Sequence, residues 1–116
     1  MINKTFEQTL EAVNSEGLVL IYISMPNCSV CHAVKPRVEQ MFANHDLPMY
    51  ALDAFEYQEV AGTFQVMTAP AILVFYQGKE VHRQARFINF QQLETLVDNY
   101  LAMSEPTSYE AIFDNN

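Results

Sequence analysis

The two cysteines of the chain are the residues best suited to chemistry. They lie three positions apart in Cys28-Ser29-Val30-Cys31, between an apolar run typical of a strand and a segment typical of a helix. At a helix N-terminus, free backbone amides and the positive end of the helix dipole favour a thiolate over a thiol. A second cysteine one helical turn later can form a disulfide with the first. The spacing therefore predicts a redox pair in which Cys28 attacks and Cys31 resolves the mixed disulfide.

Two other kinds of chemistry fit parts of the same segment. With His32 it has the form of the Cys-x-x-Cys-His signature of covalent c-type haem attachment. That chemistry usually accompanies export, and we expect no signal peptide at this N-terminus. A zinc site needs four ligands, so the cysteines and His32 would need a further histidine, His45 or His82. An ordinary surface or capping role is favoured for all three histidines, and we expect no metal.

Length and charge limit the classes of protein that the chain can represent. A chain of 116 residues is expected to form one domain that folds without the help of disulfides. Its 6 basic and 14 acidic residues give a formal charge of −8, which disfavours nucleic acids and anionic membranes as partners. The longest apolar runs are too short to span a bilayer. Because we expect neither a signal peptide nor a membrane span, we expect a cytoplasmic protein. In the reducing cytosol a CxxC pair is more often catalytic or metal-binding than structural.

Hydrophobic periodicity predicts alternating helices and strands in the first half and a hairpin in the second. Helices are expected over residues 5–14, 29–44 and 53–64, with a last helix capped by Asn89; strands are expected over 18–23, 48–52, 71–76 and 80–87. In the last strand, Val81, Ala85 and Phe87 are expected to share one face. Pro36 is expected to kink the second helix. A mixed sheet with helices on both faces is the compact arrangement of these elements.

Four features of the sequence occur together in one order and spacing. They are the Cys28–Cys31 motif, Pro36 five positions later, Met67-Thr68-Ala69-Pro70 before a strand, and Gly78 in the hairpin. Over residues 1–103 the chain thereby resembles the thioredoxin family. The resemblance implies a three-layer α/β/α sandwich with a central mixed sheet. It also implies a thiol-disulfide oxidoreductase that reduces protein disulfides with electrons from a donor such as a reductase, without a cofactor beyond the disulfide itself.

The resemblance also assigns roles around the cysteine pair. It implies that Pro70 is cis and lies against the cysteines, and that the backbone of Ala69 is offered to an extended substrate segment. Asn27 stands where thioredoxins usually carry a tryptophan, and Tyr22 replaces a buried acid thought to assist proton transfer from the resolving thiol. Tyr22 is expected to be a packing residue, with its hydroxyl near the site as the alternative. These departures keep open a second function, that of a redox-weak binding module with the same fold.

Arg86 stands where thioredoxins usually carry a glycine on the surface that faces the substrate. One hypothesis is that it stabilises the Cys28 thiolate or selects acidic partners, since arginine keeps its charge and presents a forked donor. A solvated arginine without a role is the favoured alternative. The substrate-facing residues implied by the resemblance are Asn27, Ala69, Pro70 and Arg86.

Residues 104–116 extend beyond the resemblance. Pro106 separates them from the last helix, and Thr107 with Glu110 predicts the cap of a short helical turn. This extension is expected to form a second segment after the domain of residues 1–103. The protein is expected to act as a monomer.

Overall fold

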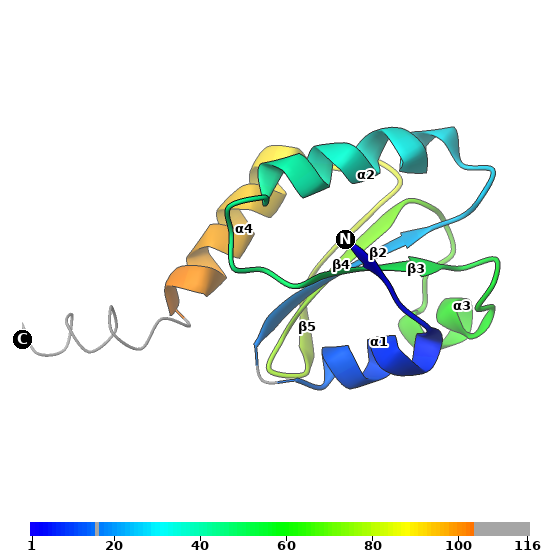
Figure 1. Ribbon diagram of the computed structural model, residues 1–116, viewed down its shortest axis with the longest axis horizontal. Helices are drawn as coiled ribbons and strands as arrows, with labels where there is room; N and C mark the ends of the chain where they lie inside the picture. Colours follow the sequence, from blue (N-terminus) through cyan, green and yellow to red (C-terminus); the bar gives the residue numbers. More distant parts are fainter. Residues whose placement is uncertain (16, 104–116) are drawn as a thin grey trace, which may run out of the picture.

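A mixed sheet of five strands forms the centre of the molecule (Figure 1). The structure is a computed structural model that describes residues 1–15 and 17–103, so the predicted extension at 104–116 lies outside the described residues. The strand order is β1-β3-β2-β4-β5. Parallel pairing joins β1 to β3 and β3 to β2, and antiparallel pairing joins β2 to β4 and β4 to β5. The strands are β1 (Ile2–Asn3), β2 (Leu18–Ser24), β3 (Met49–Asp53), β4 (Ala71–Tyr76) and β5 (Lys79–Ala85).

Helices cover both faces of this sheet, as Figure 1 shows. They are α1 (Phe6–Val13), α2 (Ser29–Met41), α3 (Glu59–Phe64) and α4 (Phe90–Met103). Side chains of α1 and α3 pack in one apolar cluster, and those of α2 and α4 pack in the other. The predicted three-layer sandwich is thus confirmed. Within the described part of the chain, none of the helices has the length and apolar character needed to cross a bilayer.

The central strand β2 explains how the two layers are held together. Val19, Ile21 and Ile23 belong to the cluster on the α1 and α3 side. Leu20 and Tyr22 alternate with them and belong to the cluster on the α2 and α4 side. Because successive strand residues point to opposite faces, an apolar run without alternation requires cover on both. This strand places the cysteine segment at its carboxyl end.

Capping hydrogen bonds confirm the predicted starts of α1 and α4, whereas α1 and α2 end earlier than predicted. The Thr5 side chain accepts a hydrogen bond from the Gln8 amide at 3.1 Å, and the Gln8 side chain accepts one from the Thr5 amide, so the predicted capping box is confirmed. Asn89 caps α4, because its Oδ1 accepts a hydrogen bond from the Gln92 amide at 3.0 Å. Helix α1 ends at Val13 and α2 at Met41, earlier than the periodicity predicts.

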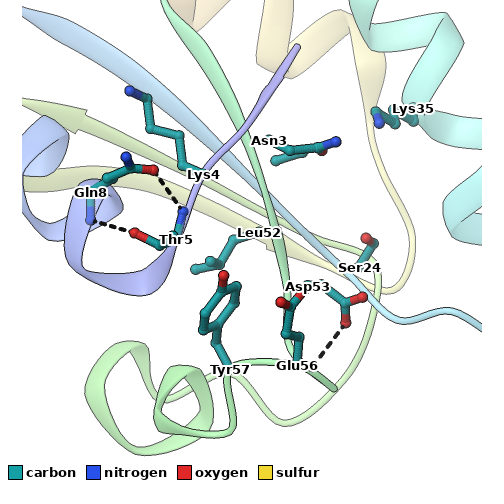
Figure 2. Close-up of a pocket in the computed structure, with 11 residues that line it drawn as sticks. Asn3, Lys4, Thr5, Gln8, Ser24, Lys35, Leu52, Asp53, Glu56 and Tyr57 are labelled. Atoms are coloured by element: carbon teal, nitrogen blue, oxygen red, sulfur yellow. Dashed lines mark hydrogen bonds between the residues drawn. The ribbon is translucent and has the colours of Figure 1, made fainter.

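The predicted helix over 53–64 is shorter than expected. Asp53 does not cap it: its Oδ1 instead accepts hydrogen bonds from the amides of Phe55 and Glu56, at 2.8 and 3.3 Å. Figure 2 shows the bond to Glu56. Aspartate stabilises a turn with the same kind of side-chain bond that it uses at a helix cap. Helix α3 begins only at Glu59. Phe55 therefore lies in a turn and is 63% exposed.

Two further expectations about the strands need correction. Strand β1 was not predicted, because two exposed residues carry no periodic signal and are fixed only by pairing with β3. Strand β5 ends at Ala85, which is exposed, and Phe87 lies beyond it and is 85% exposed. Of the predicted shared face only Val81 packs against the core. Val81 lies at a β-bulge between the pairs Val74–His82 and Phe75–Glu80, which shifts the alternation of side chains along β5. After Ala85, the φ of 71° at Arg86 takes the backbone out of the extended conformation before Phe87.

Candidate active site

Cys28 is the N-cap of helix α2. Its Sγ accepts a hydrogen bond from the Cys31 amide at 3.1 Å, and its carbonyl accepts the first helical bond, from the His32 amide at 3.3 Å. A helix N-terminus carries amides without intrahelical partners and a partial positive charge. The sulfur of Cys28 therefore sits where an anion is stabilised.

Cys28 and Cys31 are joined by a disulfide, with their Cα atoms 5.2 Å apart. Their exposure differs: Cys31 is 1% exposed, whereas Cys28 is partly exposed. A thiol-disulfide exchange begins at the sulfur that a substrate can reach. The geometry therefore agrees with Cys28 as the attacking residue and Cys31 as the resolving residue.

A surface hollow lies directly beside Cys28. Ala69 lines it, and the peptide bond from Ala69 to the buried Pro70 is cis. The Pro70 carbonyl accepts a hydrogen bond from the Arg86 amide at 2.7 Å, which ties the end of β5 to this loop. The hollow is lined by Met25, Pro26, Asn27, Cys28, Phe55, Met67, Thr68, Ala69 and Arg86. The structure thus brings Asn27, Ala69 and Arg86 together with Cys28.

The rim of this hollow carries exposed apolar side chains. Met67 is 86% exposed and Phe55 is 63% exposed, and both line the hollow with Met25. Isolated exposed apolar residues are common, but several around one depression mark an interaction surface. Phe55 was missed because its segment was interpreted as a helix.

Tyr22 contacts the cysteine segment from the core of the protein. Its side chain is 0% exposed, and its hydroxyl donates a hydrogen bond to the Cys31 carbonyl at 2.6 Å. The alternative in which the hydroxyl lies near the site is therefore the observed one, and the ring also packs in the core. Burial raises the pKa of Tyr22 to about 12. The group in the place of a buried acid is thus a neutral hydrogen-bond donor across the physiological pH range.

The three histidines lie on different elements and contact different groups. The Nε2 of His32 lies 3.0 Å from the Pro26 carbonyl, which can only accept, so this nitrogen carries the hydrogen. His45 bonds Asp98 at 2.8 Å, and His82 lies 2.9 Å from the Gln84 amide nitrogen. Residues 1–15 and 17–103 contain no group of three or more side chains placed to hold a metal.

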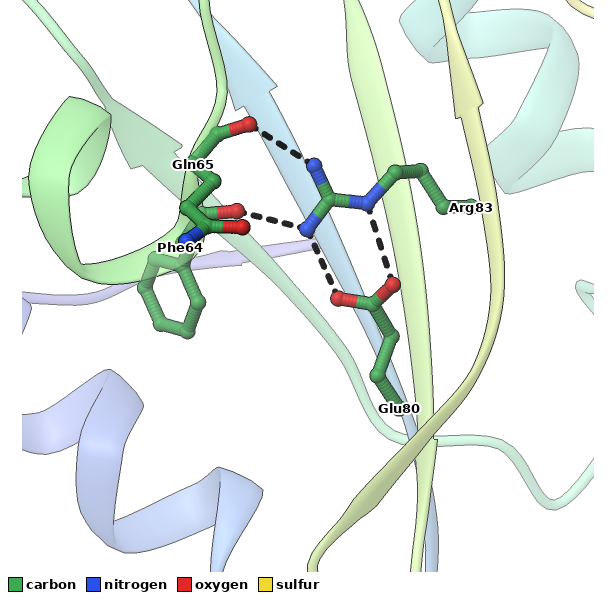
Figure 3. Close-up of polar contacts among 4 residues, drawn as sticks. All are labelled: Phe64, Gln65, Glu80 and Arg83. Atoms are coloured by element: carbon green, nitrogen blue, oxygen red, sulfur yellow. Dashed lines mark hydrogen bonds and ion pairs between the residues drawn. The ribbon is translucent and has the colours of Figure 1, made fainter.

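Arg83 supports the loop that leads to Ala69 and Pro70. Its guanidinium donates hydrogen bonds to the carbonyls of Phe64 and Gln65, at 2.5 and 2.8 Å, and to the Glu80 carboxylate (Figure 3). Glu80 also raises the pKa of Arg83 through this hydrogen bond. Phe64 is the last residue of α3. The contact therefore fixes the point at which the chain leaves α3 toward the active-site loop.

A second hollow is polar and lies away from the cysteines (Figure 2). Lys4, Lys35, Asp53 and Glu56 are among its lining, which includes neither cysteine. It therefore takes no direct part in the chemistry of the disulfide.

Most of the chain matches a known family. The family model described as Thioredoxin matches residues 1–99. The chain belongs to the thioredoxin family. Membership and the bonded cysteine pair together support a thiol-disulfide oxidoreductase.

Comparison with individual proteins agrees with membership of the thioredoxin family. Thioredoxin-like protein YdfQ of Bacillus subtilis is 46% identical over 77 residues, which cover 64% of this chain and 67% of YdfQ. Thioredoxin of the same organism is 32% identical over 102 residues, covering 86% of this chain and 98% of that protein. The solved thioredoxin of Plasmodium falciparum matches with a TM-score of 0.76 at 18% identity, covering 86% of this chain and 99% of that one. At that identity the structural match shows the fold alone.

Proposed function

We propose that the protein reduces disulfides of other proteins, with the Cys28–Cys31 pair as its redox group and without a bound cofactor. The observation that carries the proposal is the placement of Cys28. Its sulfur caps helix α2, is partly exposed, and opens onto a hollow with an apolar rim, while its bonded partner is buried. The described structure holds the oxidised form of the pair.

In the reduced protein the first step is attack by the Cys28 thiolate on one sulfur of a substrate disulfide. A bond forms between Cys28 and that sulfur, the substrate disulfide breaks, and the second substrate sulfur leaves as a thiolate. The helix N-terminus favours the Cys28 thiolate before attack. The apolar rim excludes water from the reacting sulfurs once a substrate covers it.

In the second step the Cys31 sulfur attacks Cys28. The Cys28–Cys31 bond forms, the mixed disulfide breaks, and the first substrate sulfur is released. The proton of the Cys31 thiol is balanced by protonation of a released thiolate, so one dithiol and one disulfide become one disulfide and two thiols. Tyr22 holds the Cys31 carbonyl and, as a neutral phenol, takes no proton from the thiol. The residue at the position of Tyr22 therefore does not accept the Cys31 proton.

The proposed substrate groove consists of Asn27, Ala69 and Arg86, with Pro70 behind it. The first three line the hollow with Cys28, and Pro70 is buried. An extended segment is the shape that a shallow groove with backbone groups on one side accepts, because its main chain can pair with the backbone of Ala69. The substrate cysteine is thereby held against Cys28.

The proposed partners are protein disulfides and a reductase that restores the dithiol by supplying two electrons. The proposed setting is the cytoplasm, where such a donor keeps thiols reduced, and the proposed working unit is the monomer. Similarity to a bacterial thioredoxin over 98% of its length supports this view.

A redox-weak binding module is the second candidate function. The observation that favours it is Tyr22, since a buried neutral phenol replaces the acid that assists the resolving thiol in relatives of the usual pattern. In such a module the groove would bind protein segments while Cys31 resolved mixed disulfides slowly.

Turnover of a disulfide-linked peptide, with dithiothreitol as electron donor, separates the two functions. The wild-type protein should release peptide thiols well above the rate of dithiothreitol alone, and Cys28→Ser should abolish the gain. Cys31→Ser should accumulate a mixed disulfide between Cys28 and the peptide, detected by mass. No gain in rate together with no trapped peptide would refute the proposed reductase.

A further inference from the structure

Three properties of Arg86 indicate a role at the active site. Its backbone is in the left-handed region with a φ of 71°, which costs conformational energy for any residue with a side chain. Its amide is bonded to the Pro70 carbonyl at 2.7 Å, so the residue is held beside the active-site loop. It lines the hollow that contains Cys28. A glycine would take up the same backbone without strain.

In the oxidised protein, the charge of Arg86 has no ion-pair partner within residues 1–15 and 17–103. Among the described residues that line the hollow, Arg86 is the one that bears a formal charge. No described carboxylate forms an ion pair with it, whereas the nearby Arg83 is paired with Glu80. The guanidinium carbon lies 6.0 Å from the centre of the Phe87 ring, at the outer limit of a cation–π contact.

We propose that Arg86 is a specificity residue that selects substrate segments with a carboxylate within two residues of the reacting cysteine. The inference rests on the proposed reductase function and names its substrate class. A guanidinium matches a carboxylate through two parallel hydrogen bonds. Two residues of extended chain span about 6.6 Å, which is within the reach of an arginine side chain.

The overall charge makes this preference a local one. With a formal charge of −8 the protein repels acidic partners at long range. That repulsion between exposed charges is screened beyond about 8 Å at physiological ionic strength. At contact, the pairing partner of the carboxylate is the cation in a groove of otherwise uncharged residues. The selection therefore acts on the bound segment and not on the approach of the whole partner.

Two peptide disulfides test the inference. Each is a symmetric dimer of a short peptide, with glutamate at the positions two residues before and after the cysteine in one and glutamine there in the other. The wild-type protein should reduce the glutamate peptide with a kcat/KM about five- to tenfold higher, as expected for a charge-assisted pair that remains partly solvated. The preference should shrink at 0.5 M salt.

Three variants assign the preference to Arg86. Arg86→Gln and Arg86→Gly should each bring the ratio of the two kcat/KM values close to one, because kcat/KM falls more on the glutamate peptide than on the glutamine peptide. Lys79→Gln is the matched control: it removes one positive charge from the exposed start of β5, outside the hollow, and should keep the preference.

Each possible result of these experiments either supports or overturns the role proposed for Arg86. Equal wild-type rates on the two peptides, or a preference that survives in Arg86→Gln, would overturn the inference. An equal loss of rate on both peptides in Arg86→Gln would assign Arg86 to the thiolate or the fold, and would also overturn it. If the wild-type protein reduces neither peptide, the proposed function fails, and binding decides the inference. The oxidised protein should then bind the glutamate peptide, with serine in place of cysteine, more tightly than its glutamine counterpart; equal Kd values would overturn it.

Discussion

The buried hydroxyl of Tyr22 gives the sharpest prediction about what holds the active site together. Tyr22→Phe removes one oxygen, leaves the ring in place, and deprives the buried Cys31 carbonyl of a donor at 2.6 Å. A lost hydrogen bond that leaves a buried acceptor costs about 1 to 2 kcal/mol. We predict that the oxidised variant is less stable by this amount at pH 7.

The stability advantage of wild type over Tyr22→Phe should shrink at alkaline pH and then reverse. Burial raises the pKa of Tyr22 from 10.0 to about 12, so the unfolded chain loses this proton more readily than the folded protein. The contribution of Tyr22 to stability is then fully present below pH 10 and is lost as the pH rises toward 12. At pH 11 the loss is about 1.4 kcal/mol, because one pKa unit corresponds to that free energy. Wild type and variant should therefore become equally stable between about pH 10.5 and 11.5.

Urea unfolding of the two oxidised proteins at pH 7, 10, 11 and 11.5 measures this difference directly. Tyr76→Phe is the control, since its hydroxyl has no hydrogen-bond partner among the described residues. It should change the free energy of unfolding by less than about 0.5 kcal/mol at neutral pH. A Tyr22→Phe protein as stable as wild type at pH 7, or a difference that stays constant up to pH 11.5, would refute the reasoning.

Three other predictions concern the elements that position the site. Thr5→Ala should lower the free energy of unfolding by about 1 kcal/mol in urea, because the capping box of α1 is lost; an unchanged midpoint would argue against the cap. Arg83→Met should lower the free energy of unfolding by about 1 kcal/mol and speed amide hydrogen exchange in residues 66–69, since the carbonyls at the end of α3 lose their donor. Exchange as slow as in wild type would show that the Arg83 hydrogen bonds do not hold this segment. Burial lowers the pKa of His82, so its contribution to stability is lost as the pH falls below about 6.5, where the unfolded chain binds the proton first. Acidification from pH 7.5 to 5.5 should therefore destabilise wild type more than His82→Asn, and equal slopes in unfolding experiments would contradict this.

The parts of the fold that the sequence predicts well depend on neighbours along the chain. The capping box at Thr5, the cap at Asn89 and the disulfide motif each need residues within four positions of one another. The central strand is equally clear, because an uninterrupted apolar run must be covered on both faces. These local signals determine the sandwich and the position of the cysteines.

The parts that escaped prediction depend on contacts across the fold. Strand β1 exists through its pairing with β3. Asp53 accepts hydrogen bonds from the amides of a turn. Aspartate is equally suited to a turn and to a helix cap, so its residue type does not decide between them. The left-handed backbone of Arg86, which turns Phe87 away from the core, is unusual for an arginine and has no signal in the residue types. For the site, the consequence is that the place of Phe55 in the hollow beside Cys28 became visible only in three dimensions.

The central claim is that the end of helix α2 makes Cys28 a reactive thiolate while Cys31 stays shielded. Alkylation of the reduced protein by iodoacetamide across pH 4 to 10, with each cysteine quantified by mass spectrometry, tests it most directly. Cys28 should react with a midpoint pH below that of free cysteine in water, and Cys31 should react far more slowly at every pH. A Cys28 that follows free cysteine, or a Cys31 that reacts first, would contradict the account.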